Sequence, residues 1–214
     1  MSGIKTSETG AVRDMYDAEA ESYSTMMDSE IEHPLYSDTL NRLKKRIANI
    51  PGVLIDAPCG SGHMLAMYHD NYDGERALLG IDLSPQMVAI TSLRLRSAAE
   101  VLVGDIRKLD MVPSDSAAAV ISHFALHHRD DDGVMQAIAE WHRVLRVGGQ
   151  LVIGAWEGAG AIDYGDDSDL VAVKHGANDL EKIMREGGFA ITRNVVELDE
   201  GLMMDAVYIE GVKE

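Results

Sequence analysis

Cysteine is almost absent from this sequence, and its scarcity excludes several kinds of protein. Cys59 is the single cysteine among 214 residues, so an internal disulfide or a metal site built from several cysteines cannot form. Long apolar runs are also lacking, because no window approaches 18 uncharged apolar residues, and we expect no transmembrane helix. The first residues, 1–14, lack the apolar core of a signal peptide, which predicts a cytoplasmic protein without a membrane partner.

Positive charge is the second scarcity. The 19 Lys and Arg residues stand against 36 Asp and Glu residues, and the formal net charge is −17. Such an acidic chain repels phosphate backbones, so we expect no nucleic-acid partner. The one basic cluster, at 42–46, falls on a predicted helix and is interpreted as its solvated face.

Helical and extended patterns alternate along the chain, which predicts an α/β protein with a mostly parallel sheet and right-handed crossovers. The predicted strands are 53–56, 77–82, 100–104, 117–122 and 150–156, and a closing hairpin pairs 190–198 with 202–212 around 199–201. The predicted helices are 9–27, 37–49, 62–71, 84–98 and 131–146, with a short helix up to Gly187 that Asn178 and Glu181 cap. We expect one domain over 1–214, in which helices within 1–50 cover a core formed by 51–214.

A glycine corner follows the first strand. Asp56 ends that strand, Gly60 and Gly62 turn the chain, and a helix begins near His63. Glycines allow the backbone to approach a ligand closely, and the helix N-terminus directs unpaired N–H groups toward it. The dinucleotide fingerprint would need a third glycine where Leu65 stands, which argues against a nicotinamide cofactor.

Carboxylates follow the next two strands. Asp82 ends the second strand, 26 residues after Asp56. A carboxylate at this place can accept hydrogen bonds from both hydroxyls of a ribose. Asp105 follows the third strand, where its side chain could meet an adenine amino group. Each could instead cap the element that follows it, since Asp is common in turns.

Together these motifs resemble the class I S-adenosylmethionine-dependent methyltransferases, and in particular their small-molecule branch. The matching segments, in order, are 53–62, 80–87, 104–106, 121–128 and 140–151. The resemblance implies a Rossmann-like three-layer sandwich with a seven-stranded, mostly parallel sheet and an antiparallel C-terminal hairpin. It also implies methyl transfer from S-adenosylmethionine to an O, N, S or C atom of a small-molecule acceptor in secondary or small-metabolite metabolism, leaving S-adenosylhomocysteine.

The same resemblance implies the cofactor site. Its residues would be Tyr16, Tyr23, Asp56, Ala57, Pro58, Cys59, Gly60, Gly62, Asp82, Leu83, Met87, Gly104, Asp105, Ile106 and Ser122. Residues 57–62 would hold the methionine part, Asp82 the ribose, and Asp105 with the Ile106 amide the adenine edge. Pro58 stands where the family usually has its first glycine, and the loop should be stiffer there. Cys59 is interpreted as a small packing residue.

Histidines are the candidate catalytic groups, together with Tyr16. His123, His127 and His128 lie at or just beyond the end of the fourth strand, the edge where open α/β sheets place their chemistry. A histidine can remove an acceptor's proton near neutral pH, although each of the three could be an ordinary turn residue. The spacing does not place all three on one helix face, and we expect no metal.

The acceptor site is predicted on the covering helices and on the segments that follow the later strands. Its candidate residues are Tyr23, Met27, His123, His127, Trp156 and His175. Tyr16 and Tyr23 could equally pack in the core. The sequence leaves the oligomeric state open between monomer and homodimer. Two alternatives to the methyltransferase interpretation are an NAD(P)-dependent oxidoreductase and a non-catalytic S-adenosylmethionine-fold binding protein.

Overall fold

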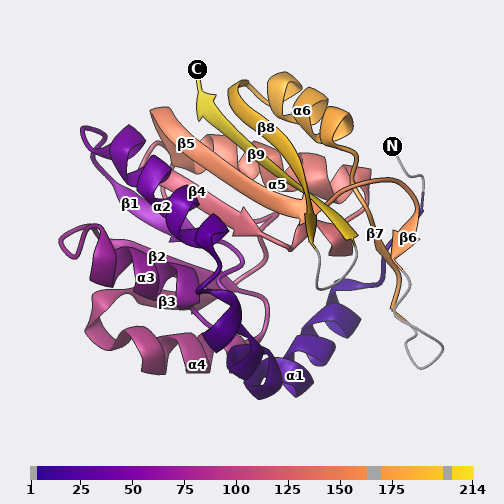
Figure 1. Ribbon diagram of the computed structural model, residues 1–214, viewed down its shortest axis with the longest axis horizontal. Coiled ribbons are helices and arrows are strands. Elements are labelled where there is room, and N and C mark those ends of the chain that lie inside the picture. Colours follow the sequence, from indigo (N-terminus) through magenta and orange to yellow (C-terminus); the bar gives the residue numbers. More distant parts are fainter. Residues whose placement is uncertain (1–3, 163–169, 200–203) are drawn as a thin grey trace.

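The chain folds into three layers around one seven-stranded sheet (Figure 1). The computed structural model describes residues 4–162, 170–199 and 204–214. The strand order is β3-β2-β1-β4-β5-β9-β8; β1 to β5 are parallel, and β9 runs antiparallel to β5 and β8. The strands are β1 (Val53–Asp56), β2 (Leu78–Asp82), β3 (Glu100–Val103), β4 (Ala117–His123), β5 (Leu145–Trp156), β8 (Phe189–Asp199) and β9 (Met204–Lys213). This architecture confirms the predicted fold class.

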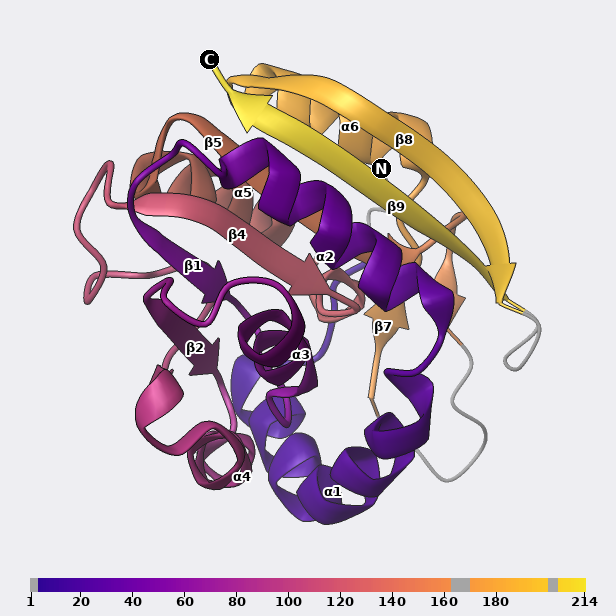
Figure 2. The same ribbon diagram turned by 60° about the vertical axis from the view of Figure 1, so that its left-hand side comes forward.

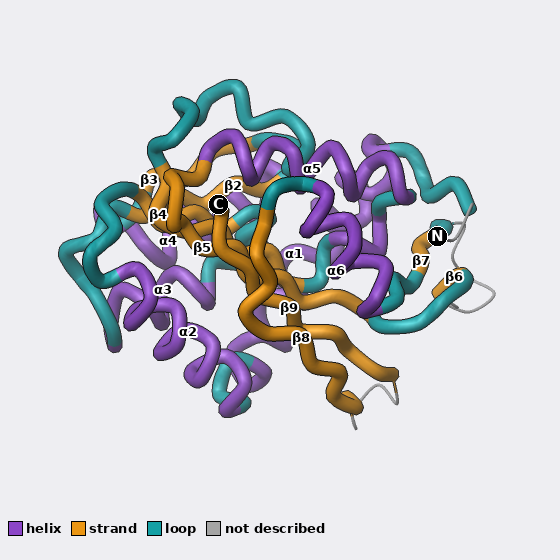
Figure 3. The backbone as a smooth tube through the Cα atoms, turned by 90° about the horizontal axis from the view of Figure 1, so that it is seen from above, coloured by secondary structure: helices purple, strands orange, loops and turns teal. Residues whose placement is uncertain are grey.

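Helices cover both faces of the sheet because successive strand residues point to opposite sides. In β1, Leu54 packs into the core beneath one set of helices and Ile55 into the core beneath the other, and both side chains are fully buried. Figure 3 shows α5 on one side of the strands and α2 and α3 on the other. The helices are α1 (Thr9–Glu30), α2 (Pro34–Ile47), α3 (His63–Asn71), α4 (Pro85–Leu95), α5 (Asp131–Val144) and α6 (Ala177–Glu186).

Helix starts depend on short polar signals. The predicted cap of α4 is confirmed: the Ser84 hydroxyl accepts a hydrogen bond from the Met87 amide at 3.1 Å, and Pro85 fills the first helical position. That helix ends at Leu95 and continues as a 3-10 turn, η1 (Arg96–Ala98). Among the described residues, no helix is long and apolar enough to cross a membrane.

The expected solvation of the basic cluster is wrong for two of its members. Arg42 and Arg46 each reach a carboxylate oxygen of Glu210 on β9 at 2.9 Å. Glu210 is 3% exposed, so the pair of guanidiniums compensates a buried charge. These residues therefore attach α2 to the sheet.

Several helices and strands begin or end at other residues than predicted, where long-range contacts outweigh the local sequence pattern. The predicted capping box of α6 is wrong, because Gly176 precedes the helix without a side-chain bond and Glu181 accepts from Asn194 and Arg185 instead. Strand β5 begins at Leu145, directly after α5, through pairing with Ala117 on β4. A second, two-stranded sheet, β6 (Ala161–Ile162) with β7 (Ala172–Val173), stands in and after the expected loop 157–169. The turn predicted around 199–201 falls largely outside the described residues.

Candidate functional site

A cavity of about 400 Å³ opens at the carboxyl ends of the parallel strands, and residues of α1 line it. Figure 2 shows α1 lying beyond these strand ends. The strand order separates its lining into two regions. The glycine end comes from the loops after β1, β2 and β3 and consists of Asp56, Pro58, Cys59, Gly60, Ser61, Asp82, Leu83, Met87, Gly104 and Ile106. The aromatic end comes from the ends of β4 and β5 with the α1–α2 region and consists of Met26, Met27, Glu30, Tyr36, His123, Phe124 and Trp156.

Asp82 organises the glycine end. One of its carboxylate oxygens accepts from the Gly60 amide at 2.8 Å, and the other accepts from the Ser84 amide at 2.9 Å. Burial raises the pKa of this carboxyl above its usual range, although both amide bonds oppose that shift. Asp82 therefore ties the glycine loop to the end of β2 while bordering the cavity.

The glycine loop has no room for side chains at its turn. Gly62 has a φ of 81°, and a Cβ there would lie 2.7 Å from Cγ2 of Thr91 on α4. The Thr91 hydroxyl donates to the carbonyl of Gly60 at 2.6 Å, which holds the loop against that helix. Cys59 packs beside Gly80, as expected of a small packing residue, and burial raises its thiol pKa.

Asp56 is buried at the end of β1 and borders the same end of the cavity. Its pKa lies well above the usual carboxyl range, first because of burial and second because of the neighbouring charge of Asp82. Two carboxyl groups thus face one region in which ionising both is costly.

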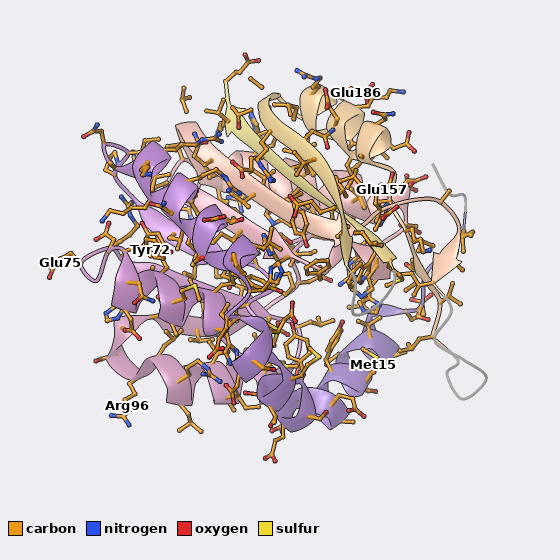
Figure 4. The ribbon with its side chains drawn as sticks, viewed as in Figure 1. Met15, Tyr72, Glu75, Arg96, Glu157 and Glu186 are labelled. Carbon is orange, nitrogen blue, oxygen red and sulfur yellow. The ribbon has the colours of Figure 1, made fainter. Side chains whose placement is uncertain are left out.

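Helix α1 forms the roof through polar contacts. Asp17 accepts from the Ser84 hydroxyl and from the Gln86 amide, and the Tyr16 hydroxyl lies 2.9 Å from Nε2 of His128. Toward the end of the helix, Asp28 lies 2.8 Å from Nε2 of His63. In Figure 4, Met15 marks this helix, with Glu157 marking the segment after β5.

The Tyr23 ring from the same helix closes the glycine loop from above. It lies 3.2 Å from the position that a Cβ of Gly60 would take. Burial, followed by the charge of Asp82, raises the Tyr23 pKa to about 12. Both predicted tyrosines of α1 border the cavity, and Tyr23 also packs against the hydrophobic core beneath α2 and α3.

Rings converge at the aromatic end. The Phe124 and Trp156 ring centroids are 4.5 Å apart, and His123 lies 6.1 Å from both Tyr36 and Tyr208. Desolvation lowers the pKa of His123 to about 4, so its imidazole is neutral at pH 7. Phe124 has a φ of 51°, a strained conformation for a bulky residue.

Most of the predicted site residues lie at this cavity. They are Tyr16, Tyr23, Met27, Asp56, Pro58, Cys59, Gly60, Asp82, Leu83, Met87, Gly104, Ile106, His123, His128 and Trp156. Those outside its lining are Ala57, Gly62, Asp105, Ser122, His127 and His175.

The outlying residues have other contacts or lie behind the lining. Asp105 is held by the Arg107 guanidinium at 2.6 Å, and Arg107 keeps the pKa of that carboxyl below its usual range despite partial burial. His127 packs on His128 with 3.9 Å between ring centroids. His175 lies 2.7 Å from the carbonyl of Leu126 through Nε2. In the described part of the chain, no group of three potential ligands could hold a metal ion.

Several lining residues were not predicted. These are Val12, Met26, Glu30, Tyr36, His63, Met64, Phe124, Ala125 and Arg129, whereas Ser61 falls within the predicted methionine-binding segment 57–62. Phe124 directly follows β4, and its position beside the predicted His123 was an available signal. Tyr36 and Arg129 reach the cavity only through tertiary packing, which no local pattern indicates.

Comparison with known proteins gives a family match over the centre of the chain. A family model described as "Methyltransferase domain" matches residues 54–149, which include the glycine loop, Asp82 and β4. A malonyl-(acyl-carrier protein) O-methyltransferase of Serratia marcescens is 31% identical over 133 residues, 62% of this chain and 49% of that protein. The chain spans less than half the length of the curated relatives it matches.

Solved structures share the fold over nearly the whole chain. The 1,6-didemethyltoxoflavin-N1-methyltransferase of Burkholderia thailandensis has a TM-score of 0.75 at 16% identity, covering 95% of this chain and 88% of that one. The (4+2) cyclase SpnF has a TM-score of 0.77 at 18% identity, covering 99% of both chains. At these identities the similarity shows a common architecture.

Proposed function

Because the chain belongs to the class I S-adenosylmethionine-dependent methyltransferases, we propose that it transfers the methyl group of S-adenosylmethionine to a small-molecule acceptor. The observation that carries this proposal is the Asp82 carboxylate, which lies at the end of β2 in the cavity wall and binds the Gly60 amide of the facing glycine loop. A short loop that leaves backbone exposed beside a carboxylate suits a nucleoside ligand.

The residues of the glycine end fit this cofactor. Asp82 would accept the ribose hydroxyls, and Leu83 and Met87 would pack on the adenine ring. The Ile106 amide would meet the adenine edge. Both oxygens of the Asp105 carboxylate already accept hydrogen bonds from Arg107, so Asp105 would contribute there only through a remaining lone pair.

The chain's own contribution to the reaction is position and the exclusion of water. When bound, the cofactor supplies a methyl group already activated by a sulfonium. Tyr16 and Tyr23 on α1 would close the cavity over the reacting groups, and orientation alone can supply effective molarities of about 10⁵–10⁸ M.

Among the candidate catalytic groups, His123 is the best placed. It borders the aromatic end and is neutral at pH 7. His128 is engaged by Tyr16, and His127 lies behind it, so we propose positioning roles for these two. A cytoplasmic location, the absence of a nucleic-acid partner and a monomeric or homodimeric state remain predictions from the sequence.

The test is formation of S-adenosylhomocysteine by the purified chain, with mass spectrometry of the products. The acceptor panel should contain carboxylic acids and nitrogen heterocycles, since relatives act on malonyl-(acyl-carrier protein) and 1,6-didemethyltoxoflavin. We expect S-adenosylhomocysteine, and not NADH or NADPH, to raise the melting temperature. Stabilisation by a nicotinamide nucleotide alone would contradict the proposal, and cofactor binding without methylation of any acceptor would favour a non-catalytic role.

A further inference from the structure

The aromatic end brings together rings from distant parts of the chain. Tyr36 comes from α2, His123 and Phe124 from the end of β4, and Trp156 from the end of β5. Phe124 and Trp156 form the closest pair, at 4.5 Å. The strained backbone at Phe124 places a large ring where the fourth and fifth strands end. Flat apolar surfaces on several sides favour a planar ligand, since rings stack face to face or edge to face.

His123 is an unsatisfied polar group in this apolar surrounding. Neither of its ring nitrogens has a hydrogen-bond partner among the described residues, although both are buried. The ring packs directly on Gly154 of β5, where an added Cβ would lie only 3.3 Å from the imidazole Cγ. Buried polar atoms are normally hydrogen-bonded. Because His123 also lines the cavity, a donor brought by a ligand there would satisfy one of these nitrogens.

The side chains at this end disfavour an anionic acceptor. The aromatic-end residues include no Lys or Arg, and their one carboxyl side chain, Glu30, accepts from the Tyr36 hydroxyl at 3.3 Å. The one arginine in the described lining, Arg129, lies 4.0 Å from Asp105 on the side of β3. A phosphate or carboxylate placed among these rings would thus lose water without gaining a cation.

We propose that the acceptor is an uncharged planar molecule, a phenol, enol or ring N–H compound, which lies among Phe124, Trp156 and Tyr36 and donates its O–H or N–H to His123. This inference rests on the proposed methyltransferase function and names the substrate class of that site.

The transfer step balances with these groups. A lone pair of the acceptor heteroatom forms the new bond to the methyl carbon, and the S–CH₃ bond breaks with its electron pair remaining on sulfur. The proton of the acceptor O–H or N–H passes to His123 and then to water. Because methylation makes that proton far more acidic as the bond forms, a weakly basic imidazole is sufficient.

The experiment compares ligands of one shape and different charge. Calorimetry, with S-adenosylhomocysteine saturating, would measure the binding of 2-naphthol, 2-naphthoate and 2-naphthylmethylammonium. We expect 2-naphthol to bind at least tenfold more tightly than either ion. Tighter binding of the ammonium would instead indicate a cationic acceptor held by the rings and Glu30, and tighter binding of the carboxylate, or no binding of any probe, would likewise overturn the inference.

Variants separate the hydrogen bond from the shape of the site. His123→Phe keeps a ring and removes both nitrogens, so 2-naphthol affinity should fall about tenfold while that for 2-methoxynaphthalene, which lacks the donor, stays unchanged. His142→Phe, on α5 against Phe189, is the matched control and should change neither. An equal loss for both ligands would contradict the hydrogen bond. Absence of S-adenosylhomocysteine binding to the unmodified chain would instead be failure of the proposed function, and it is measured separately.

Discussion

The two ends of the cavity satisfy their polar groups in opposite ways. At the glycine end, Asp82 and Thr91 already hold the loop through hydrogen bonds to Gly60. At the aromatic end, both ring nitrogens of His123 are buried without a hydrogen-bond partner among the described residues. A region whose loop is already held in place binds one ligand at little reorganisation cost. At the aromatic end, a ligand must supply the hydrogen bond that the His123 nitrogens lack.

This contrast explains why the cofactor class is easier to infer than the acceptor. The glycine end is defined by backbone conformation and by carboxylates at strand ends, and such features repeat wherever the same ligand binds. The aromatic end is defined by side chains from α2 and from the ends of β4 and β5, whose identities the backbone fold does not dictate. Perturbing each end separately therefore tests the comparison.

The largest expected effect comes from filling the turn at Gly62. Gly62→Ala would combine strain at φ 81° with a contact of 2.7 Å to Thr91, and we expect a loss of about 3 kcal/mol of unfolding free energy in urea. Gly160→Ala is the matched control, because its φ is 87° but nothing lies within 4 Å of the added Cβ, and about 1 kcal/mol is expected there. Equal losses would show that close packing at the glycine loop is unimportant.

The next effect concerns the aromatic end and pH. The folded pKa of His123, about 4, lies below the unfolded value, so the unfolded chain binds more protons between these values and stability falls as pH drops through this window. Relative to pH 7.5, the wild type should lose about 2 kcal/mol at pH 5 through this group alone.

The measurement is the difference in unfolding free energy between the wild type and His123→Phe at both pH values. Using the difference cancels the opposite contribution of Asp56 and Asp82, whose raised pKa values favour the folded state at low pH. A difference that does not change with pH would mean that His123 is hydrated in solution.

A smaller effect should follow from loosening the roof over the glycine end. The Asp17 carboxylate accepts hydrogen bonds from Ser84 and Gln86 at the start of α4, and Asp17→Asn removes its charge. We expect the free energy of unfolding to fall by about 1–2 kcal/mol. We expect S-adenosylhomocysteine affinity to fall about tenfold by calorimetry. Asp14→Asn, on the same helix and bonded to the adjacent Arg13, should leave this affinity unchanged. Similar losses of affinity in both variants would show that the contact of α1 with α4 does not support cofactor binding.

The smallest effect belongs to the Tyr16 hydroxyl. Tyr16→Phe removes the contact with His128 at a cost of about 1 kcal/mol, and cofactor affinity should weaken by about threefold to fivefold. Tyr72→Phe removes a comparable bond to the Ser37 carbonyl, outside the cavity, and should reduce stability alone. Stability is measured by thermal unfolding and cofactor affinity by calorimetry. If both quantities changed equally in the two variants, the Tyr16 hydroxyl would have no specific role in cofactor binding.

Local patterns were sufficient for the parts of the site that short segments build. The apolar run before Asp56, the glycines after it and the Ser84–Pro85 helix start are each confirmed as elements that position the cavity. Each depends on neighbours within a few residues, which is why the sequence alone indicates them.

Long-range pairings could not be read in the same way. Arg42 meets Glu210 across 168 positions, because burial selects charge partners only after the chain has folded. Tyr36 reaches the aromatic end because α2 packs on β4 and β5 (Figure 2). The same limit applies to the capping box expected at Asn178, where Asn194 on β8 binds Glu181 instead.

The central claim is that the glycine end holds S-adenosylmethionine through Asp82, and isothermal titration with S-adenosylhomocysteine tests it most directly. The wild type should bind one molecule per chain. Asp82→Asn, which keeps the shape of the side chain but removes its charge and one of its two acceptors, should bind at least 100-fold more weakly, about 2.7 kcal/mol. Equal affinities in the two proteins, with both folded, would contradict the account.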